Sequence, residues 1–507
     1  MLSIIEILKT FSLEEMNRFK RFIESSYHNK SEKLRKLFKE ISKHYPGFTS
    51  KNLNKEYLSK KISPSLKYND STFRNMIFDM QILLEKFMII EQVFESGSEK
   101  NIFLLKSLVD RGNDVLFRKT LKKTMNQTEE SGIDSIYYRT KSHLELYQIN
   151  NNELNKSVRS TKDIDDNITN LYKYIIYITN DFILEIINSH LTLKVQESKF
   201  NIRKKTDFSL GLIESFDINK ISQHIKKADK NNFILDLYLQ LFLTFQNLEN
   251  RQSYSNYKSL ISKHYKKLSR DELAYHYSML ITYCLIQNSN DRIKSDYDNE
   301  LFRLYHIFLK EKLFIDKKTQ YISEVIYRNI LVLSLRLKKY DWTFGFISQY
   351  SKYLHPEKHK NMVNFANASY YYNLGSDNNS LVDLNKAFEH LKEIKEESFI
   401  YKYDIKILYL MLYYDLGYID NLLSQLRNYR QFLSRNLLVT ERKKERMNKF
   451  LNILEKLTFL KEGNTKIDLA KLNTDILKLN NYNYQEWLLK KVQIFNRNTN
   501  FKKLKHG

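Results

Sequence analysis

Glycine and proline are scarce in this sequence, and their scarcity restricts the possible folds more than any other feature. The 507 residues include 10 glycines and 3 prolines, and no proline occurs between Pro64 and Pro356. A parallel-sheet or all-β fold needs turn residues at intervals of about 8 to 12 positions. The sequence therefore predicts an all-α fold.

The stretch from Asn361 to Asn436 contains the same pattern twice. In each unit, an apolar helix ends at Leu-Gly, a few polar residues follow, and a second apolar helix begins. Apolar residues recur at steps of three and four, which places them on one face of each helix. The expected helices cover 365–375, 381–394, 405–417 and 422–433. Short links of this kind favour antiparallel packing of the two helices in a unit.

The residues between these helices predict how each helix ends and begins. Gly375 and Gly417 follow the last apolar position, so we expect both to adopt a left-handed conformation at a helix C-terminus. Ser380 and Asp420 are expected to cap the helices that follow. A single helical hairpin cannot bury its apolar face alone, so the units should stack into an α-solenoid.

The repeated unit resembles a tetratricopeptide repeat. The resemblance rests on Ala366, Tyr370 and Leu374-Gly375 in the first helix, and on the segment from Leu384 to Leu391 in the second. The steps between Leu-Gly positions and their equivalents are 37 and 42 residues, against 34 in the regular repeat, so the resemblance implies a degenerate array. It transfers no binding residues. The segments 11–48 and 410–436 also resemble uncharacterised helical proteins from bacteria, for which no function is established.

Four regions are predicted along the chain. Residues 1–96 form a compact helical domain that ends at Ser96-Gly97-Ser98, and Ser12 with Glu15 has capping-box spacing within it. A helical region at 97–229 joins or begins the array, and the tetratricopeptide-like solenoid covers 230–480. The last region, 481–507, is a basic C-terminal end, and its residues 496–507 are expected to fray.

The region 97–229 contains a long apolar run that bears on packing. Residues 171–187 are apolar on most sides, which predicts a helix buried between neighbours. The polar stretch from Asp163 to Asn167 precedes this run and is expected to be a solvated loop. Asp163, Asp165 and Asp166 lack the glycine and the distal glutamate of a calcium loop.

No local motif in the sequence predicts catalysis. It contains no glycine-rich phosphate loop, no GxSxG and no HExxH, so we expect no catalytic, cofactor-binding or metal-binding residues. His355 and His359 are four residues apart, but Pro356 places His355 at a helix cap and argues against a shared metal. The single cysteine, Cys284, excludes an internal disulfide and is expected to be a small core residue.

Two further groups are interpreted as structural. Tyr370, Tyr371 and Tyr372 could stack on single-stranded nucleic acid, but core packing with one exposed ring is the preferred interpretation. The basic residues from Arg442 to Arg446 are opposed by Glu441 and Glu445, which favours a solvated helix face.

A net charge of +24 raises the alternative of nucleic-acid binding. The charge is spread evenly, since residues 1–100 hold 18 basic and 13 acidic side chains, a net of +5. Only the end after Trp487 is strongly basic. A second possible nucleic-acid site is a helix-turn-helix in the N-terminal domain, with residues 71–86 as the helix that would read the groove, and this interpretation is the weaker one.

The sequence thus predicts a non-enzymatic helical-repeat scaffold that binds a protein or peptide in its concave groove, with partner-binding residues unknown. The alternative is nucleic-acid binding through the N-terminal helical domain and the basic surface. No secretory signal and no apolar run of 18 residues occur, so a cytoplasmic protein without a membrane partner is expected.

Overall fold

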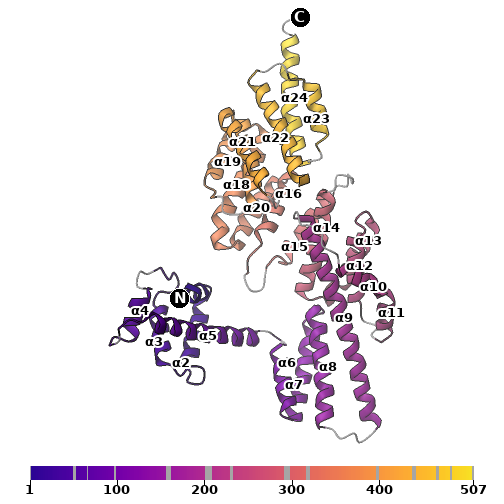
Figure 1. Cartoon of the computed structure of the whole chain (residues 1–507). Coiled ribbons are helices and arrows are strands. Elements are labelled where there is room, and N and C mark those ends of the chain that lie inside the picture. Colours follow the sequence, from indigo (N-terminus) through magenta and orange to yellow (C-terminus); the bar gives the residue numbers. More distant parts are fainter. Residues whose placement is uncertain are drawn as a thin grey trace. The chain divides into compact units, whose positions relative to one another are not determined.

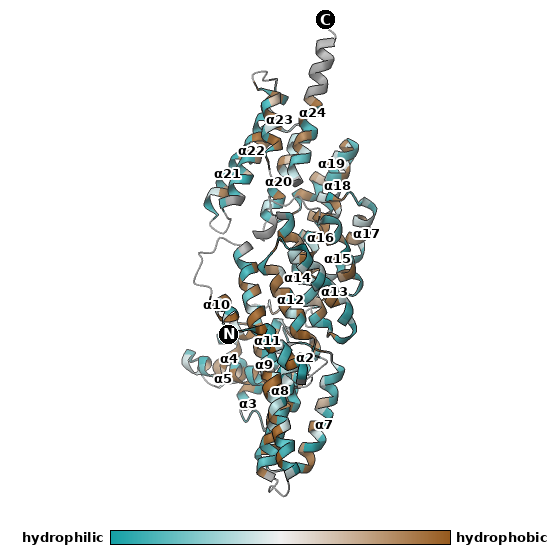
Figure 2. Cartoon of the chain, turned by 90° about the vertical axis from the view of Figure 1, so that its right-hand side faces the viewer, coloured by the Kyte–Doolittle hydropathy of each residue, from teal (hydrophilic) through white to brown (hydrophobic). Residues whose placement is uncertain are grey.

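The computed structural model contains helices and no strand arrows (Figure 1), which confirms the predicted all-α fold for the residues that it describes. These are residues 2–504 without 50–52, 66, 96, 98, 156–160, 200–207, 229–231, 290–296, 316–319, 396–398, 437–440, 464–466 and 480–481. One isolated bridge, between Ile133 and Leu268, is the β-type pairing seen among them. Most helices carry both apolar residues, coloured brown, and polar residues, coloured teal (Figure 2).

The chain forms two units by its internal contacts. The first comprises Met1–Glu130 and Arg139–Ile175, and the second comprises Ser131–Tyr138 and Ile176–Gly507. Two long helices, α8 (Ser135–Asn155) and α9 (Thr161–Lys199), contribute residues to both units.

Helices α1 to α5 share one hydrophobic core in the first unit. Their bounds are α1 (Leu2–Lys9), α2 (Leu13–Glu24), α3 (Glu32–Ser42), α4 (Lys55–Ile62) and α5 (Asp70–Glu95). The predicted capping box starts α2: the Ser12 N–H donates to Glu15 Oε2 at 2.6 Å, and the Glu15 N–H donates to Ser12 Oγ at 3.2 Å. Helices α6 (Glu99–Asp110) and α7 (Asp114–Glu130) form a smaller core with α8. Of the predicted boundary at residues 96–98, the structure describes Gly97 alone. Gly97 lies in a turn, and its N–H donates to the Glu95 carbonyl at 3.0 Å.

The second unit continues as consecutive helical pairs. Its helices after α9 are α10 (Phe208–Ser215), α11 (Ile218–Ala228), α12 (Ile234–Gln246), α13 (Arg251–His264), α14 (Arg270–Ser289), α15 (Asp298–Lys310), α16 (Glu324–Arg336), α17 (Tyr340–Tyr350), α18 (Pro356–Asn378), α19 (Leu381–Lys392), α20 (Phe399–Leu416), α21 (Ile419–Arg435), α22 (Glu441–Lys461), α23 (Leu469–Leu477) and α24 (Tyr482–Leu504). The helices of each pair from α12/α13 to α20/α21 contact one another. The first helices of consecutive pairs also meet, α16 with α18 and α18 with α20.

The two glycines of the repeated unit, Gly375 and Gly417, have different structural roles. Gly417 follows α20 with φ of +80°, which confirms the predicted left-handed helix end. The prediction for Gly375 was wrong, because α18 continues to Asn378 and Asn379 takes the left-handed conformation. Gly375 instead permits close packing, since a Cβ there would lie 2.9 Å from the Leu384 backbone nitrogen.

The two predicted helix caps also differ. The Asp383 N–H donates to Ser380 Oγ at 3.3 Å, which confirms Ser380 as the cap of α19. Asp420 was predicted wrongly as a cap. Helix α21 starts at Ile419, two residues earlier than a cap at Asp420 would require, so Asp420 lies in its first turn, where a negative charge favours the helix dipole.

Two predictions about irregular segments were also wrong. The aspartates at 163, 165 and 166 lie in the first turns of α9 and not in a loop, because acidic residues stabilise a helix N-terminus. The C-terminal end was expected to fray from Asn496, but α24 continues through Leu504. Residues 505–507 lie outside the described residues. None of the described helices combines the length and the apolar character needed to cross a bilayer.

Candidate functional site

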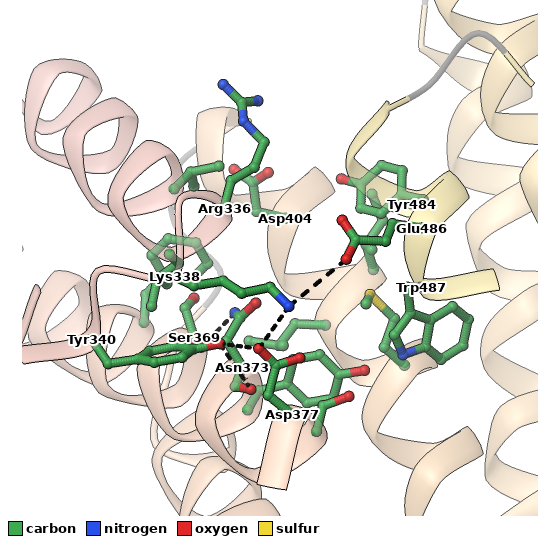
Figure 3. Close-up of a pocket in the computed structure, with 18 of the residues that line it drawn as sticks. Arg336, Lys338, Tyr340, Ser369, Asn373, Asp377, Asp404, Tyr484, Glu486 and Trp487 are labelled. Carbon is green, nitrogen blue, oxygen red and sulfur yellow. Dashed lines mark hydrogen bonds and ion pairs between the residues drawn. The ribbon is translucent and has the colours of Figure 1, made fainter. Parts of the chain in front are cut away.

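A cavity of about 190 Å³ lies in the second unit, where α16, α17, α18, α20 and α24 meet (Figure 3). The first helices of three consecutive pairs supply most of its wall, and α24, Tyr340 of α17 and Lys338 of the turn before it supply the remainder. The polar and charged side chains that line it are Arg328, Arg336, Lys338, Tyr340, Ser369, Tyr372, Asn373, Ser376, Asp377, Asp404, Tyr484, Glu486, Trp487 and Lys490.

Asp377, near the end of α18, is the centre of a charged cluster at the cavity. Its carboxylate accepts from Tyr340 Oη at 2.6 Å and from Lys490 Nζ at 2.8 Å, and it lies 3.2 Å from Lys338 Nζ. Glu486 Oε1 lies 3.8 Å from both lysine nitrogens. Figure 3 shows Lys338 extending between Asp377 and Glu486. Two cations and two anions thus face one another across α18 and α24.

Local backbone geometry brings these groups together. Lys338 follows α16 in a left-handed conformation with φ of +55°, and α17 begins two residues later with Tyr340. This tight turn directs the side chains of both residues toward Asp377. Burial raises the pKa of Asp377, but the hydrogen bonds from Lys490, Tyr340 and Lys338 outweigh it, so the pKa lies below its ordinary value. The carboxylate is therefore ionised at neutral pH.

A second ion pair lies deeper in the cavity wall. Arg328 of α16 donates to both oxygens of Asp404 on α20, at 2.7 and 2.6 Å, and the two side chains are 28% and 14% exposed. Burial lowers the pKa of Arg328, but Asp404 outweighs this and raises the pKa above its ordinary value. A bidentate pair of this kind fixes the angle between two helices as well as their distance.

Helix α24 is joined to the first helices by a neighbouring set of contacts. Lys491 Nζ lies 2.6 Å from Asp415 on α20, and both side chains are largely buried. Asp415 also accepts from Tyr372 Oη at 3.0 Å. Trp487 is buried against Tyr414, with ring centroids 5.5 Å apart. Basic and aromatic residues of α24 thus complement acidic and aromatic residues of α18 and α20.

The size and composition of the cavity indicate what it can hold. Sites for small molecules and cofactors usually enclose about 300–1,000 Å³. A volume of about 190 Å³ is below that range and suits one or two side chains of a polypeptide. Phe365, Leu408 and Met411 provide apolar wall, while the two lysines stand at the more exposed side. The arrangement suits an apolar side chain next to a carboxylate.

Of the residues that were considered from the sequence, Tyr372 and the start of the basic end, at Trp487 and Lys490, line this cavity. Tyr372 lines it and is buried, whereas Tyr370 and Tyr371 are half-buried. The expectation that one of the three rings is exposed was therefore wrong. Tyr371 stacks on His390 with centroids 5.8 Å apart. Cys284 is fully buried in α14, which confirms the core assignment.

His355 and His359 behave as the proline predicts. His355 is the N-cap of α18 and its carbonyl accepts from the His359 N–H at 2.9 Å. The part of the chain that the structure describes contains no group of three or more His, Cys, Asp or Glu that could hold a metal ion. At the start of α22, Lys444 Nζ lies 2.8 Å from Glu441. The side chains of Arg442 and Lys443 lie outside the described residues.

The candidate reading helix is part of α5. Arg74, on its exposed face, pairs with Asp70 at 2.5 Å, and Phe78 on the same helix is 61% exposed. The Asp70 carboxylate takes part in further bonds, from Tyr68 Oη at 2.7 Å and from Lys55 Nζ at 3.1 Å. A cation engaged by a neighbouring carboxylate and an exposed phenyl ring do not favour phosphate contacts.

Most of the cavity residues were missed in the sequence because no local pattern joins them. They come from five helices spread over more than 150 positions, between Arg328 and Lys490. The basic end after Trp487 was the one available signal, but it was interpreted only in terms of nucleic-acid binding. No family model matches the chain, and neither a curated protein nor a solved structure is significantly similar to it.

Proposed function

We propose that the protein is a non-enzymatic helical-repeat scaffold that binds a protein or peptide segment at the cavity between α16, α18, α20 and α24. The observation that carries this proposal is that first helices of three consecutive pairs line one cavity together with the Asp377 cluster. A stacked array places such helices on its inner face, which is the surface that repeat proteins use for binding.

The Asp377 cluster suggests which peptide group binds. Asp377 lies within 3.2 Å of both lysines, whereas Glu486 is 3.8 Å from each and 57% exposed. Glu486 is therefore the weaker of the two anions and the one that a ligand carboxylate can displace. We propose a ligand that offers a carboxylate to Lys338 and Lys490 and an apolar side chain to Phe365, Leu408 and Met411.

A selection from a displayed peptide library tests this proposal directly. We expect wild-type protein to enrich peptides in which an acidic residue or a free C-terminus lies beside an apolar residue. Lys338→Glu should weaken binding of these peptides by about tenfold or more, because it removes one cation and adds a repelling anion. Isothermal titration calorimetry with the enriched peptides measures the change.

Lys339→Glu is the matched control. Lys339 is the next residue, lies over the Phe302 ring and does not line the cavity. The same charge reversal should therefore leave the affinity within about twofold of wild type. Enrichment of no peptide, or equal affinity of selected peptides for both variants, would contradict the proposal.

The alternative of nucleic-acid binding gains no support from the basic C-terminal end as far as its side chains are described. Lys491 is largely buried and engaged by Asp415 at 2.6 Å. Ammonium groups held by carboxylates within the fold contribute less to phosphate binding than free ones. We therefore rank this alternative second.

A further inference from the structure

Helix α9 carries a row of large apolar side chains on an exposed face. The row consists of Ile164, Ile168, Leu171, Ile175, Ile178 and Phe182. Each of these side chains is between 44% and 49% exposed. This result corrects the expectation that the apolar run of α9 is buried between neighbours, because only one side of the helix is covered. We call these six residues the α9 seam.

The other side of α9 supplies the packing that holds the helix. Asn180, Leu184 and Ile187 are fully buried there, and the Asn180 amide donates to the Ile176 carbonyl at 2.9 Å. The α9 seam is therefore additional to the face that the helix uses for its own core. A helix that serves only one core has a single apolar face.

The spacing of the α9 seam is that of a helix–helix interface. Its members follow one another at steps of 4, 3, 4, 3 and 4 residues, which is the 3.5-residue period of a coiled-coil seam. The seam covers 18 residue steps, or about 27 Å of helix. Helix α9 is already folded in the single chain, so pairing carries no cost of helix formation.

The charges beside the seam indicate what kind of helix it pairs with. The flanking positions hold Asp165, Asn167, Tyr172, Tyr174, Thr179 and Asp181, and no lysine or arginine. Lys173 stands on another side of α9, near Glu145 of α8: burial raises the pKa of the Glu145 carboxyl, and the Lys173 ammonium offsets part of that rise. The chain carries a net charge of +24, but two copies that meet at this surface would bring no lysine or arginine of the flanking positions close together. Repulsion between cations therefore does not oppose pairing there.

The size of the seam is compatible with such a pair. A fully exposed Ile, Leu or Phe side chain presents roughly 150–200 Å², so six that are nearly half exposed present on the order of 500 Å². Two copies would bury about 1,000 Å² of apolar surface, the lower limit for a specific interface. Phe182 also lies against Phe216, which is 43% exposed and extends the apolar surface.

We propose that α9 is a dimerisation helix, and that the α9 seam of one copy packs against the α9 seam of a second copy of this chain. Self-pairing of one surface generates a closed two-fold dimer. The proposal does not depend on the peptide-binding cavity, so either can fail without the other.

Sedimentation equilibrium of the full chain tests the proposal. Wild-type protein should reach twice the 61.2 kDa of a single chain as its concentration rises through the micromolar range. The double variant Ile168→Asp/Ile178→Asp should weaken association by about 100-fold or more, because both charges would be buried in the seam. These positions are 46% and 44% exposed in the single chain, so the helical circular dichroism signal should persist.

The control is Val115→Asp/Leu154→Asp, which places the same charges at apolar residues that are 83% and 67% exposed on α7 and α8. This control should associate as wild type does. If the double variant loses helicity, the milder Leu171→Asn is measured in its place, with a weaker dimer expected. A wild type that stays monomeric, or a dimer unaffected by the seam variants, would overturn the proposal.

Discussion

Cys284 lies in the interior of α14, where its side chain is fully buried. Burial raises the pKa of its thiol to about 12, and the nearby Glu300 carboxylate acts in the same direction. Tyr254 Oη lies 3.6 Å from the sulfur and opposes the shift. A thiol with this pKa is almost wholly protonated at neutral pH and is a poor nucleophile.

We expect Cys284 to resist thiol reagents in the native protein. At pH 8 only about one thiol in ten thousand would be ionised, against about one in ten for an ordinary thiol with a pKa near 9. Labelling with a chromogenic disulfide should be at least about 100-fold slower than in denaturant. An introduced Ser348→Cys, on the exposed side of α17, provides a control thiol that should react at once. Rapid native labelling of Cys284 would contradict its burial.

At the scale of elements, the α18–α19 hairpin depends on the absence of a side chain at Gly375. A Cβ at this position would lie 2.9 Å from the Leu384 nitrogen and 3.1 Å from the Ser380 carbonyl oxygen. Both atoms belong to the backbone at the start of α19, so they cannot move without shifting the helix. The glycine therefore fixes how closely α19 follows α18.

We expect Gly375→Ala to lower the free energy of unfolding by about 1–3 kcal/mol, because the added methyl group would overpack the hairpin. Gly345→Ala is the matched control: Gly345 lies within α17, and a Cβ there would meet no atom within 4 Å. That substitution should raise stability by about 0.5–1 kcal/mol, since alanine favours a helix interior over glycine. Urea unfolding followed by circular dichroism compares the two, and an equal effect of both would contradict the close approach.

Across the whole molecule, many charged side chains form local ion pairs, although basic side chains outnumber acidic ones by 83 to 59. Several lysines are paired with acids three or four residues away, including Lys9 with Glu6, Lys36 with Glu32 and Lys43 with Glu40. Pairs of this kind leave alternating charges on the surface. An interface for duplex DNA instead needs several cations that act on phosphates together.

We expect the chain to bind duplex DNA weakly and to lose that binding between low and physiological salt, as nonspecific electrostatic contacts do. The alternative function predicts a specific complex that survives at about 150 mM salt, with a log–log slope of about −0.9 per neutralised phosphate. A mobility-shift titration at several salt concentrations measures both quantities. Tight binding that persists at physiological salt would favour the alternative over the scaffold proposal.

Local patterns in the sequence were sufficient for the helices and many of their ends. The capping box at Ser12, the cap at Ser380 and the left-handed Gly417 each depend on residues within a few positions of one another, so each could be predicted. Gly375 could not, because its role depends on backbone that α19 brings close. The extent of α24 was missed for the same reason, since Asp377 and Asp415 precede the lysines of α24 that they pair with by more than 70 positions.

The sequence by itself determined the all-α class, because ten glycines and three prolines leave few turns and the apolar residues recur at helical spacing. Only the tertiary structure decided which apolar face of α9 is covered and which charged residues meet at Asp377. Periodicity fixes the direction in which a side chain leaves its own helix, whereas the candidate sites arise where separate helices come together. That second step depends on packing between residues far apart in the chain, which no local pattern encodes.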